Sequence, residues 1–324
     1  SSVLDDEKRL LEIINETKSR AQMRLNSAGH SAAVARATSY FSPSSAYGDV
    51  TGGIAFYQFL EDLSKNFEER KNTLMEKLKE TAERLFTADN LIVSFTADEK
   101  GWDGMKKSLK LLTDALPETG GERYTFTCDK GNKNEGFMTS SQVNYVARCG
   151  SFAESGLPYT GALRTLKVIL GYDYLWLNVR VKGGAYGVMN GAGRTGEGYF
   201  VSYRDPNLKE TNQVFENVVK YLEEFDADER DMTKYVIGTI SDLDVPLLAP
   251  YKGSKADAAY FSHLTDEMIK KEREEILKAT KEDIRALAPV IREILSTGSF
   301  CVIGNAEKIR ENQELFGEVK NLFN

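Results

Sequence analysis

The stretch VRVKGGAYGVMNGAGRTGEGYFVSYRDPN, residues 179–207, joins a glycine-rich loop to a strand-like end. Gly191, Gly193 and Gly196 fit the G-x-G-x-x-G spacing of a nucleotide-binding loop. That fingerprint follows a strand and opens a helix, whereas this motif is followed by GYFVSYRD, in which residue types alternate as in a strand. The context argues against phosphate binding, and a glycine-rich β-hairpin at a solvent edge stays open as the alternative.

Helical and strand patterns flank this stretch on both sides. TGALRTLKVILGYDYLWLNVRV, residues 160–181, predicts a helix that runs toward the glycine loop. Residues 142–152 and 299–305 predict strands, because both are short runs of mostly apolar and β-branched residues. Helical patterns dominate from residue 208 up to the second of these strands. This part of the chain therefore predicts helices packed on a sheet.

The N-terminal third predicts mostly helix. A helix that starts near Leu4 is predicted to stop at Gly29, and a second helical stretch runs through residues 52–86 with many opposite charges four residues apart. LIVSFTAD, residues 91–98, predicts a buried strand. Residues 101–116 predict the helix that packs on this strand.

The composition is that of a globular protein. Hydrophobic residues make up 41% of the 324 residues, and no apolar run approaches the roughly 18 residues of a membrane span. The formal net charge is −7 and both signs are interleaved, so neither a membrane nor a nucleic acid is an expected partner. Cys128, Cys149 and Cys301 are odd in number and far apart, which argues against a disulfide framework and favours a reducing compartment such as the cytoplasm.

Familiar catalytic motifs are missing from the sequence. Its two histidines, His30 and His263, lie far apart, and neither belongs to an H-E-x-x-H or H-x-x-E-H helix. A zinc site would require long-range convergence, so we expect no metal ligand in this chain and interpret both histidines as packing or helix-end residues. A G-x-S-x-G nucleophile elbow and a cysteine nucleophile signature are missing as well.

Three long blocks of the sequence resemble one enzyme family. They are LNSAGHSAAVARATSYFSPSSAYGDVTGGIAFYQFL (residues 25–60), NLIVSFTAD (residues 90–98) and LNVRVKGGAYGVMNGAGRTGEGYFVSYRDPN (residues 177–207). Together they resemble the C-terminal half of the presequence-protease branch of the M16, or insulinase-like, inverzincin metallopeptidases. The resemblance extends over essentially the whole chain.

The resemblance implies an α+β fold in which a mixed or antiparallel sheet is covered by helices. Family members have four related domains arranged as two halves that close around a peptide. By this resemblance, residues 1–117 are the C-terminal portion of the third domain, helix-rich and ending in a strand and a helix. Residues 118–136 are a polar, glycine-containing linker, and residues 137–324 are the complete fourth domain.

The resemblance also implies a function, that of a zinc-dependent endopeptidase that degrades short unstructured peptides in a closed chamber. The zinc ligands of the family belong to the N-terminal catalytic half, so this chain alone is expected to bind no zinc and to be inactive. Its expected partners are that half of the same polypeptide and peptide substrates, in the cytoplasm or an organellar matrix. The alternative is a non-catalytic M16-like module that binds peptides or serves in an assembly.

Site residues follow from the same resemblance. An arginine and a tyrosine spaced as Arg180 and Tyr186 reach into the chamber in the family and contact the substrate near the scissile bond. Such a pair suits amide hydrolysis, because a guanidinium and a phenol would stabilise the negative charge that builds on the carbonyl oxygen. Gly183 and Gly184 are expected to let the loop approach a peptide backbone closely.

Overall fold

The computed structural model describes residues 5–119, 121–122, 124–128 and 130–323. The chain divides into two compact units, each assembled from segments that are distant in sequence. The first unit comprises residues up to Thr17, Leu60–Thr125 and Val245–Ile269. The second comprises Lys18–Phe59, Phe126–Asp244 and Lys270–Asn324.

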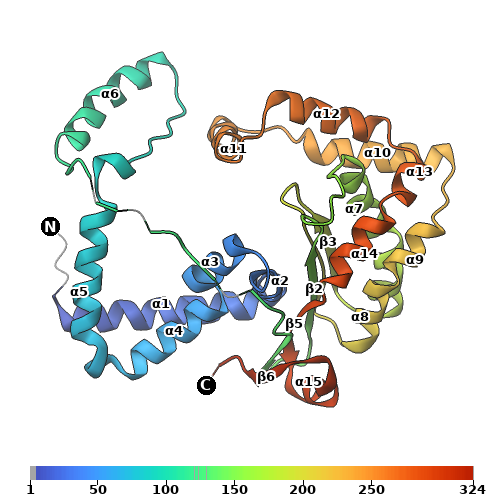
Figure 1. Ribbon diagram of the computed structural model, residues 1–324, viewed down its shortest axis with the longest axis horizontal. Coiled ribbons are helices and arrows are strands. Elements are labelled where there is room, and N and C mark those ends of the chain that lie inside the picture. The colour runs from blue at the N-terminus through green and yellow to red at the C-terminus, as the bar shows by residue number, and fades with distance from the viewer. Residues whose placement is uncertain (1–4, 120, 123, 129, 324) are drawn as a thin grey trace. The chain divides into compact units, whose positions relative to one another are not determined.

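One six-stranded sheet organises the second unit, in the order β3-β4-β2-β5-β1-β6 (Figure 1). Its strands are β1 (Glu135–Thr139), β2 (Tyr145–Ser151), β3 (Gly187–Ala192), β4 (Glu197–Tyr203), β5 (Ser299–Asn305) and β6 (Glu318–Asn321). Neighbours from β3 to β5 are antiparallel, whereas β1 lies parallel to both β5 and β6. The predicted α+β class with a mixed sheet covered by helices is confirmed.

The sequence predicts three of these strands and misses the others. The strands expected at residues 142–152 and 299–305 are β2 and β5, and GYFVSYRD forms β4. β3 lies within the glycine-rich stretch and pairs with β4, which makes the two strands the hairpin that the sequence left open. β1 and β6 escape prediction because EGFMT and EVKN are too short to establish an alternating pattern.

Helices of the second unit begin where capping residues allow. At the capping box of residues 280–283, the Thr280 hydroxyl accepts from the Asp283 amide while the Asp283 carboxylate accepts from the Thr280 amide. Helices that lie wholly in this unit are α2 (Gly29–Ser39), α3 (Pro43–Gly52), α7 (Ala162–Tyr172), η2 (Trp176–Lys182), α8 (Lys209–Glu216), α9 (Val218–Glu223), α10 (Glu229–Leu243), α13 (Lys281–Arg285), α14 (Ala288–Ser296), α15 (Ala306–Glu311) and η3 (Gln313–Leu315).

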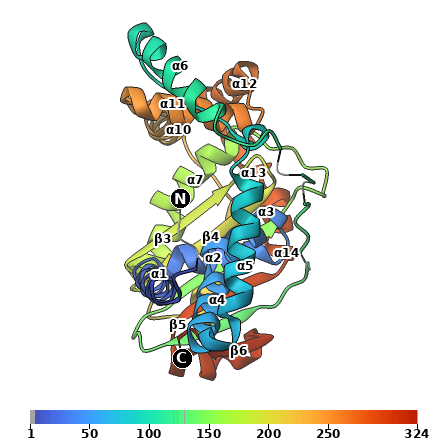
Figure 2. The ribbon, with the colours of Figure 1, turned by 90° about the vertical axis from the view of Figure 1, so that its left-hand side faces the viewer.

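These helices cover both faces of the sheet. Because successive strand residues point to opposite faces, neighbours in β2 meet different helices. Cys149 faces α2, where its Sγ lies 3.8 Å from the Val34 carbonyl oxygen. Arg148 faces α14 and donates from Nη2 to the Leu295 carbonyl oxygen at 3.1 Å. Figure 1 shows α2 and α3 on one side of the sheet and α14 on the other, and in Figure 2 α2 crosses in front of the strands.

A buried ion cluster ties α2 and α3 to the sheet. The carboxylate of Glu135, fully buried in β1, accepts hydrogen bonds from Arg36 Nε at 2.5 Å, Arg36 Nη2 at 2.9 Å and the Tyr40 hydroxyl at 2.7 Å. Lys320 Nζ of β6 lies 2.7 Å from the same carboxylate, and Arg36 also pairs with Asp49 of α3. Burial alone would raise the pKa of Glu135, but these partners, Arg36 foremost, outweigh burial and lower it to about 2.

The first unit is helical in its described residues. Three helices, α1 (Glu7–Ser27), α4 (Ile54–Lys65) and α12 (Asp266–Leu277), have residues in both units. The others are α5 (Phe67–Leu85), η1 (Ala88–Asn90), α6 (Glu99–Thr113) and α11 (Ala249–Phe261).

The prediction of a buried strand at residues 91–98 is wrong. These residues form no strand, and Ile92 is 70% exposed. The Ser94 hydroxyl donates to Asp257 Oδ2 of α11 at 2.7 Å, so the segment is held by a side-chain contact. A strand needs the backbone ladder of a neighbour, and no described residue of this unit is in a strand. Strand propensity alone therefore does not produce a strand here.

The prediction that Gly29 ends the first helix is also wrong in part. α1 does end close by, at Ser27, but Gly29 is the first residue of α2. A Cβ at Gly29 would lie 2.3 Å from the ring of Tyr145 in β2. The glycine is required because α2 approaches the sheet closely at this point, and not because the chain leaves the helix.

Candidate functional site

The predicted site residues lie where η2 turns into β3. η2 is a π-helix that ends at Lys182 and contains Arg180 in its last turn. The chain then reverses: the Gly184 amide donates to the Arg180 carbonyl oxygen at 2.9 Å, and the Ala185 amide donates to that of Val179 at 3.1 Å. Tyr186 follows directly, one residue before β3 begins.

Arg180 and Tyr186 come together at this turn, with Trp176 as a third member. The Arg180 guanidinium carbon lies 4.0 Å from the centroid of the Trp176 ring and 5.8 Å from that of Tyr186. The Tyr186 ring is 66% exposed and meets the Tyr203 ring edge-on, with 5.8 Å between centroids. Cation–π contacts with two rings hold the guanidinium in one orientation while its N–H groups stay available.

Arg180 carries no competing carboxylate. Among the residues that the structure describes, no Asp or Glu oxygen lies within 4.0 Å of its guanidinium. Trp176 was missed by the sequence reasoning, although its position four residues before Arg180 on a helical segment was the signal that could have found it. The geometry supplies a positioned, uncompensated cation and an exposed phenol side by side, which suits the binding of a peptide carbonyl oxygen.

Gly183 and Gly184 are required by the turn itself. A Cβ at Gly183 would lie 2.6 Å from the Val179 carbonyl oxygen. Gly184 has a φ of +80°, in the left-handed region that side chains disfavour. Asn207 Nδ2 donates to the Gly183 carbonyl oxygen at 2.6 Å and fixes the loop from the side. A further role of the two glycines in admitting a peptide backbone stays a prediction.

Replacing Gly184 by alanine is expected to lower the free energy of unfolding by about 1–2 kcal/mol. The cost is conformational, because the nearest atom to the new Cβ would be Pro206 Cγ at 3.6 Å, which is an ordinary contact. Urea denaturation of the chain measures the change. Gly171→Ala is the control, since Gly171 lies in α7 with open space around its Cβ position, and alanine there should be neutral or stabilising. Equal stabilities for the two variants would contradict the strain at Gly184.

The G-x-G-x-x-G motif forms the turn of the β3–β4 hairpin. The Gly193 amide donates to the Glu197 carbonyl oxygen at 2.8 Å, and the Gly196 amide donates to that of Gly193 at 3.0 Å. The turn leads into β4 and not into a helix, so it lacks the helix N-terminus that a phosphate site needs. Arg194 at the turn bonds to Glu272 and lies 4.9 Å over the Tyr159 ring, so its charge is already used.

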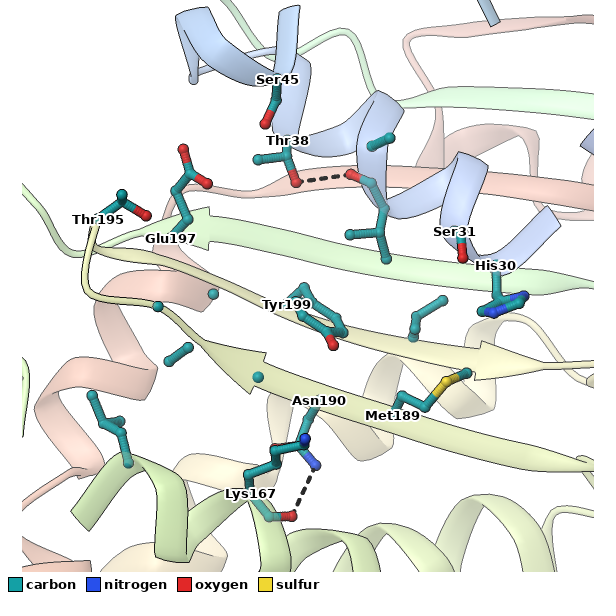
Figure 3. A pocket seen from close by; sticks show the side chains of 18 of the residues that line it. His30, Ser31, Thr38, Ser45, Lys167, Met189, Asn190, Thr195, Glu197 and Tyr199 are labelled. Atoms are coloured by element: carbon teal, nitrogen blue, oxygen red, sulfur yellow. Dashed lines mark hydrogen bonds between the residues drawn. The ribbon is translucent and has the colours of Figure 1, made fainter. Parts of the chain in front are cut away.

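A pocket of about 590 Å³ opens beside this hairpin (Figure 3). Its walls come from α2, with Val34 and Ala35, and from the hairpin strands, with Met189 and Tyr199. His30 stands at one end, where its ring meets the Tyr203 ring edge-on with 4.9 Å between centroids. Burial lowers the pKa of His30, which favours the neutral ring at neutral pH. His30 therefore packs as the sequence predicts.

The described residues provide neither a metal cluster nor a reactive buried thiol. No group of three or more His, Cys, Asp or Glu side chains in that part of the chain could hold a metal ion. The buried cysteines are unreactive, since burial raises the pKa of Cys149 to about 12 and that of Cys301 well above its ordinary value. None of the helices built from described residues is long and apolar enough to cross a bilayer.

Two family models match the sequence. The model described as the PreP C-terminal domain matches residues 134–305, and a model described as a region associated with M16 peptidases of subfamily C matches residues 1–63. The first match contains the whole Arg180–Tyr186 turn and the hairpin that follows it. The two matches define a module of the M16 peptidase class.

Similar proteins agree with this class. The chain is 40% identical over 319 residues to Protein HypA of Clostridium perfringens, a match that covers 98% of this chain and 33% of that protein. It is 30% identical over 320 residues to Presequence protease 1, chloroplastic/mitochondrial, of Arabidopsis thaliana, covering 97% of this chain and 30% of that protein. The chain belongs to the PreP C-terminal domain family and spans about a third of the length of these relatives. The resemblance predicted from the sequence is confirmed.

Solved structures show only distant likeness. A peptidase M16 inactive domain from Pseudomonas fluorescens is 16% identical with a TM-score of 0.44, and the match covers 62% of this chain and 50% of that one. A likeness of this size carries no argument about function, so the assignment rests on the sequence matches.

Proposed function

We propose that this chain is the C-terminal half of a zinc-dependent endopeptidase that degrades short unstructured peptides in a closed chamber. Its family membership and its similarity to a protein named as a presequence protease support the proposal. In this proposal residues 1–117 are the end of a third M16-type domain, residues 118–136 a linker and residues 137–324 the fourth domain. The zinc ligands and the general base belong to the N-terminal half of the same polypeptide.

The observation that carries the proposal is the stacked Arg180–Tyr186 pair. The guanidinium lies between the Trp176 and Tyr186 rings with no carboxylate beside it in the described part of the chain. As a peptide bond is hydrolysed, negative charge builds on the carbonyl oxygen, and a preorganised cation with a phenol hydroxyl stabilises that charge. Gly183 and Gly184 keep the loop narrow beside the bound peptide backbone.

Compartment and partners follow from the same relatives. The Arabidopsis protein is named as chloroplastic and mitochondrial, and a Yarrowia lipolytica relative is named as mitochondrial. We place the present protein in a reducing compartment, either the cytoplasm or an organellar matrix, because its two buried cysteines are free thiols. Peptides are its substrates, and neither a membrane nor a nucleic acid is among its partners.

The chain by itself is expected to hold no stoichiometric zinc and to hydrolyse no peptide. Joined to the upstream half of the same polypeptide, it is expected to show peptide hydrolysis that a chelator abolishes, because the ligands come from that half. Elemental analysis of both proteins and a quenched fluorescent peptide substrate measure the two properties. One tightly held zinc in the isolated chain would contradict the proposal. A joined protein that binds peptides without cleaving them would establish the non-catalytic alternative.

A further inference from the structure

We propose that the outer edge of β3 binds an extended peptide as an added strand, whose side chains on one face enter the pocket between α2 and the hairpin. This inference deepens the proposed function, on which it rests, because it names the conformation of the substrate. It concerns the second unit alone, to which every residue involved belongs.

β3 is an edge strand with a free row of backbone groups. Its neighbour in the sheet is β4, and it begins the strand order. The Gly193 amide donates to the Glu197 carbonyl oxygen, which sets the phase of the β3–β4 ladder. In an antiparallel pair the residues that bond the partner alternate, so Val188, Asn190 and Ala192 direct their N–H and C=O groups away from β4.

The β2–β4 pairing supports the same phase. The Phe152 amide donates to the Gly196 carbonyl oxygen, so the even-numbered residues of β4 face β2 and the odd-numbered ones face β3. Within the described part of the chain, no backbone group of Val188, Asn190 or Ala192 bonds to any further element. These three residues therefore offer three donors and three acceptors in the spacing of a strand.

The pocket lies against this edge and not only against one face of the sheet. Five consecutive residues, Met189 to Gly193, line it, whereas Phe200 of β4 is left out between Tyr199 and Val201. Successive strand residues point to opposite faces, so a pocket that touches every residue of a stretch meets the strand at its edge. Five residues span roughly 16 Å at about 3.3 Å per residue, which accommodates a short peptide.

The walls of the pocket define the side chains that fit. On the α2 side, Val34 and Ala35 face Met189 and Tyr199, which form an apolar slot (Figure 3). On the other side of β3 the pocket reaches the exposed Lys167 of α7, so the opposite face of an added strand meets solvent and charge. A peptide with apolar residues at alternate positions satisfies both sides.

The edge is continuous with the Arg180–Tyr186 pair. Tyr186 immediately precedes β3, and its amide donates to the Tyr203 carbonyl oxygen of β4 at 3.1 Å. A strand added along β3 therefore runs past the exposed phenol and the guanidinium stacked behind it. Main-chain pairing would supply affinity for peptides of many sequences, while the arginine and tyrosine act on one carbonyl group.

Binding of a fluorescein-labelled nonapeptide to the 324-residue chain tests the proposal. The peptide carries phenylalanine at its centre, to fix the register in the apolar slot, between alternating valine and serine. Singly N-methylated versions are compared by fluorescence anisotropy. Methylation at every second position is expected to weaken binding about tenfold and the intervening positions little, because only alternate amides face β3.

Protein variants test the same edge from the other side. Ala192→Pro removes an outward-facing amide that the β4 ladder does not use, and is expected to weaken binding about tenfold at unchanged thermal stability. The control is Glu229→Pro, at the exposed first position of α10, where proline is tolerated and the pocket is distant in the fold. Binding should be unchanged in this control.

Several outcomes overturn the inference. They are the absence of binding, equal tolerance of N-methylation at all positions, and full binding by Ala192→Pro. A β3-to-β3 dimer that takes the edge in place of the peptide, detected by light scattering and lost in Ala192→Pro, overturns it as well. None of these measurements uses zinc or hydrolysis. Failure of the inference is therefore distinguishable from failure of the proposed function, which chelator-sensitive cleavage by the joined protein reports.

Discussion

Replacing Arg180 by alanine in the proposed full-length enzyme is expected to lower kcat/KM for peptide hydrolysis by about 10- to 1,000-fold, the range for a lost charge-stabilising donor. Tyr186→Phe should fall in the same range, because it removes the hydroxyl and keeps the ring that stacks against the guanidinium. Zinc content and thermal stability should stay at the parent values. Initial rates on several peptides at sub-saturating concentration measure the effect.

Two comparisons make this expectation specific. The double variant should cost less free energy than the sum of the single variants, because either loss misplaces the same carbonyl group. Lys182→Ala is the matched control, since Lys182 is an exposed cation two residues from Arg180 whose Nζ contacts Asn178 at 3.4 Å. Arg194 would be a poor control, because its pairing with the buried Glu272 gives it a structural role. Parent activity in both Arg180→Ala and Tyr186→Phe would remove the mechanistic claim.

The second large effect concerns the buried ion cluster. Arg36→Met is expected to lower the free energy of unfolding by about 3–5 kcal/mol, because it leaves the fully buried Glu135 carboxylate without its main partner. Adding Glu135→Leu to Arg36→Met should restore part of the loss, since the uncompensated charge is then gone. Urea denaturation at neutral pH measures all three proteins. A single Arg36→Met variant as stable as the parent would contradict the assigned role of the cluster.

The same cluster predicts how stability depends on pH. The pKa of Glu135 is about 2 in the folded chain against an ordinary 4.5, so the folded state holds its carboxylate charged over a wider range than the unfolded state does. Its contribution to stability is fully present above pH 4.5 and is lost as pH falls toward 2. Glu135→Gln should therefore flatten the acid limb of a stability profile measured from about pH 6 to about pH 2, and an unchanged limb would contradict this assignment.

Sequence patterns predicted the strands that carry strong alternation and failed where partners decide. β2, β4 and β5 are apolar and β-branched, so their patterns are readable. β3 is glycine-rich and becomes a strand because β4 offers it a ladder. Residues 91–98 have the opposite history, since they have strand propensity but no strand partner among the described residues of their unit. Long-range pairing is thus the physical information that a local pattern lacks.

The candidate site divides in the same way. Arg180, Tyr186 and Trp176 lie close in sequence, so a single turn brings them together and a sequence motif can identify them. The pocket could not be predicted from the sequence, because its apolar slot forms only when Val34 of α2 meets Met189 and Tyr199, which come much later in the chain. Close packing of α2 on the sheet, which Gly29 permits, creates that slot.

The position of β1 between β5 and β6 has a consequence for biosynthesis. β1 is translated long before either neighbour, and both neighbours come from the last part of the chain. Until translation is nearly complete, β1 has no strand to pair with, and the Glu135 carboxylate lacks Lys320. Closure of the sheet is therefore a late event after synthesis, and the nascent chain exposes strand edges that chaperones must shield until the C-terminus leaves the ribosome.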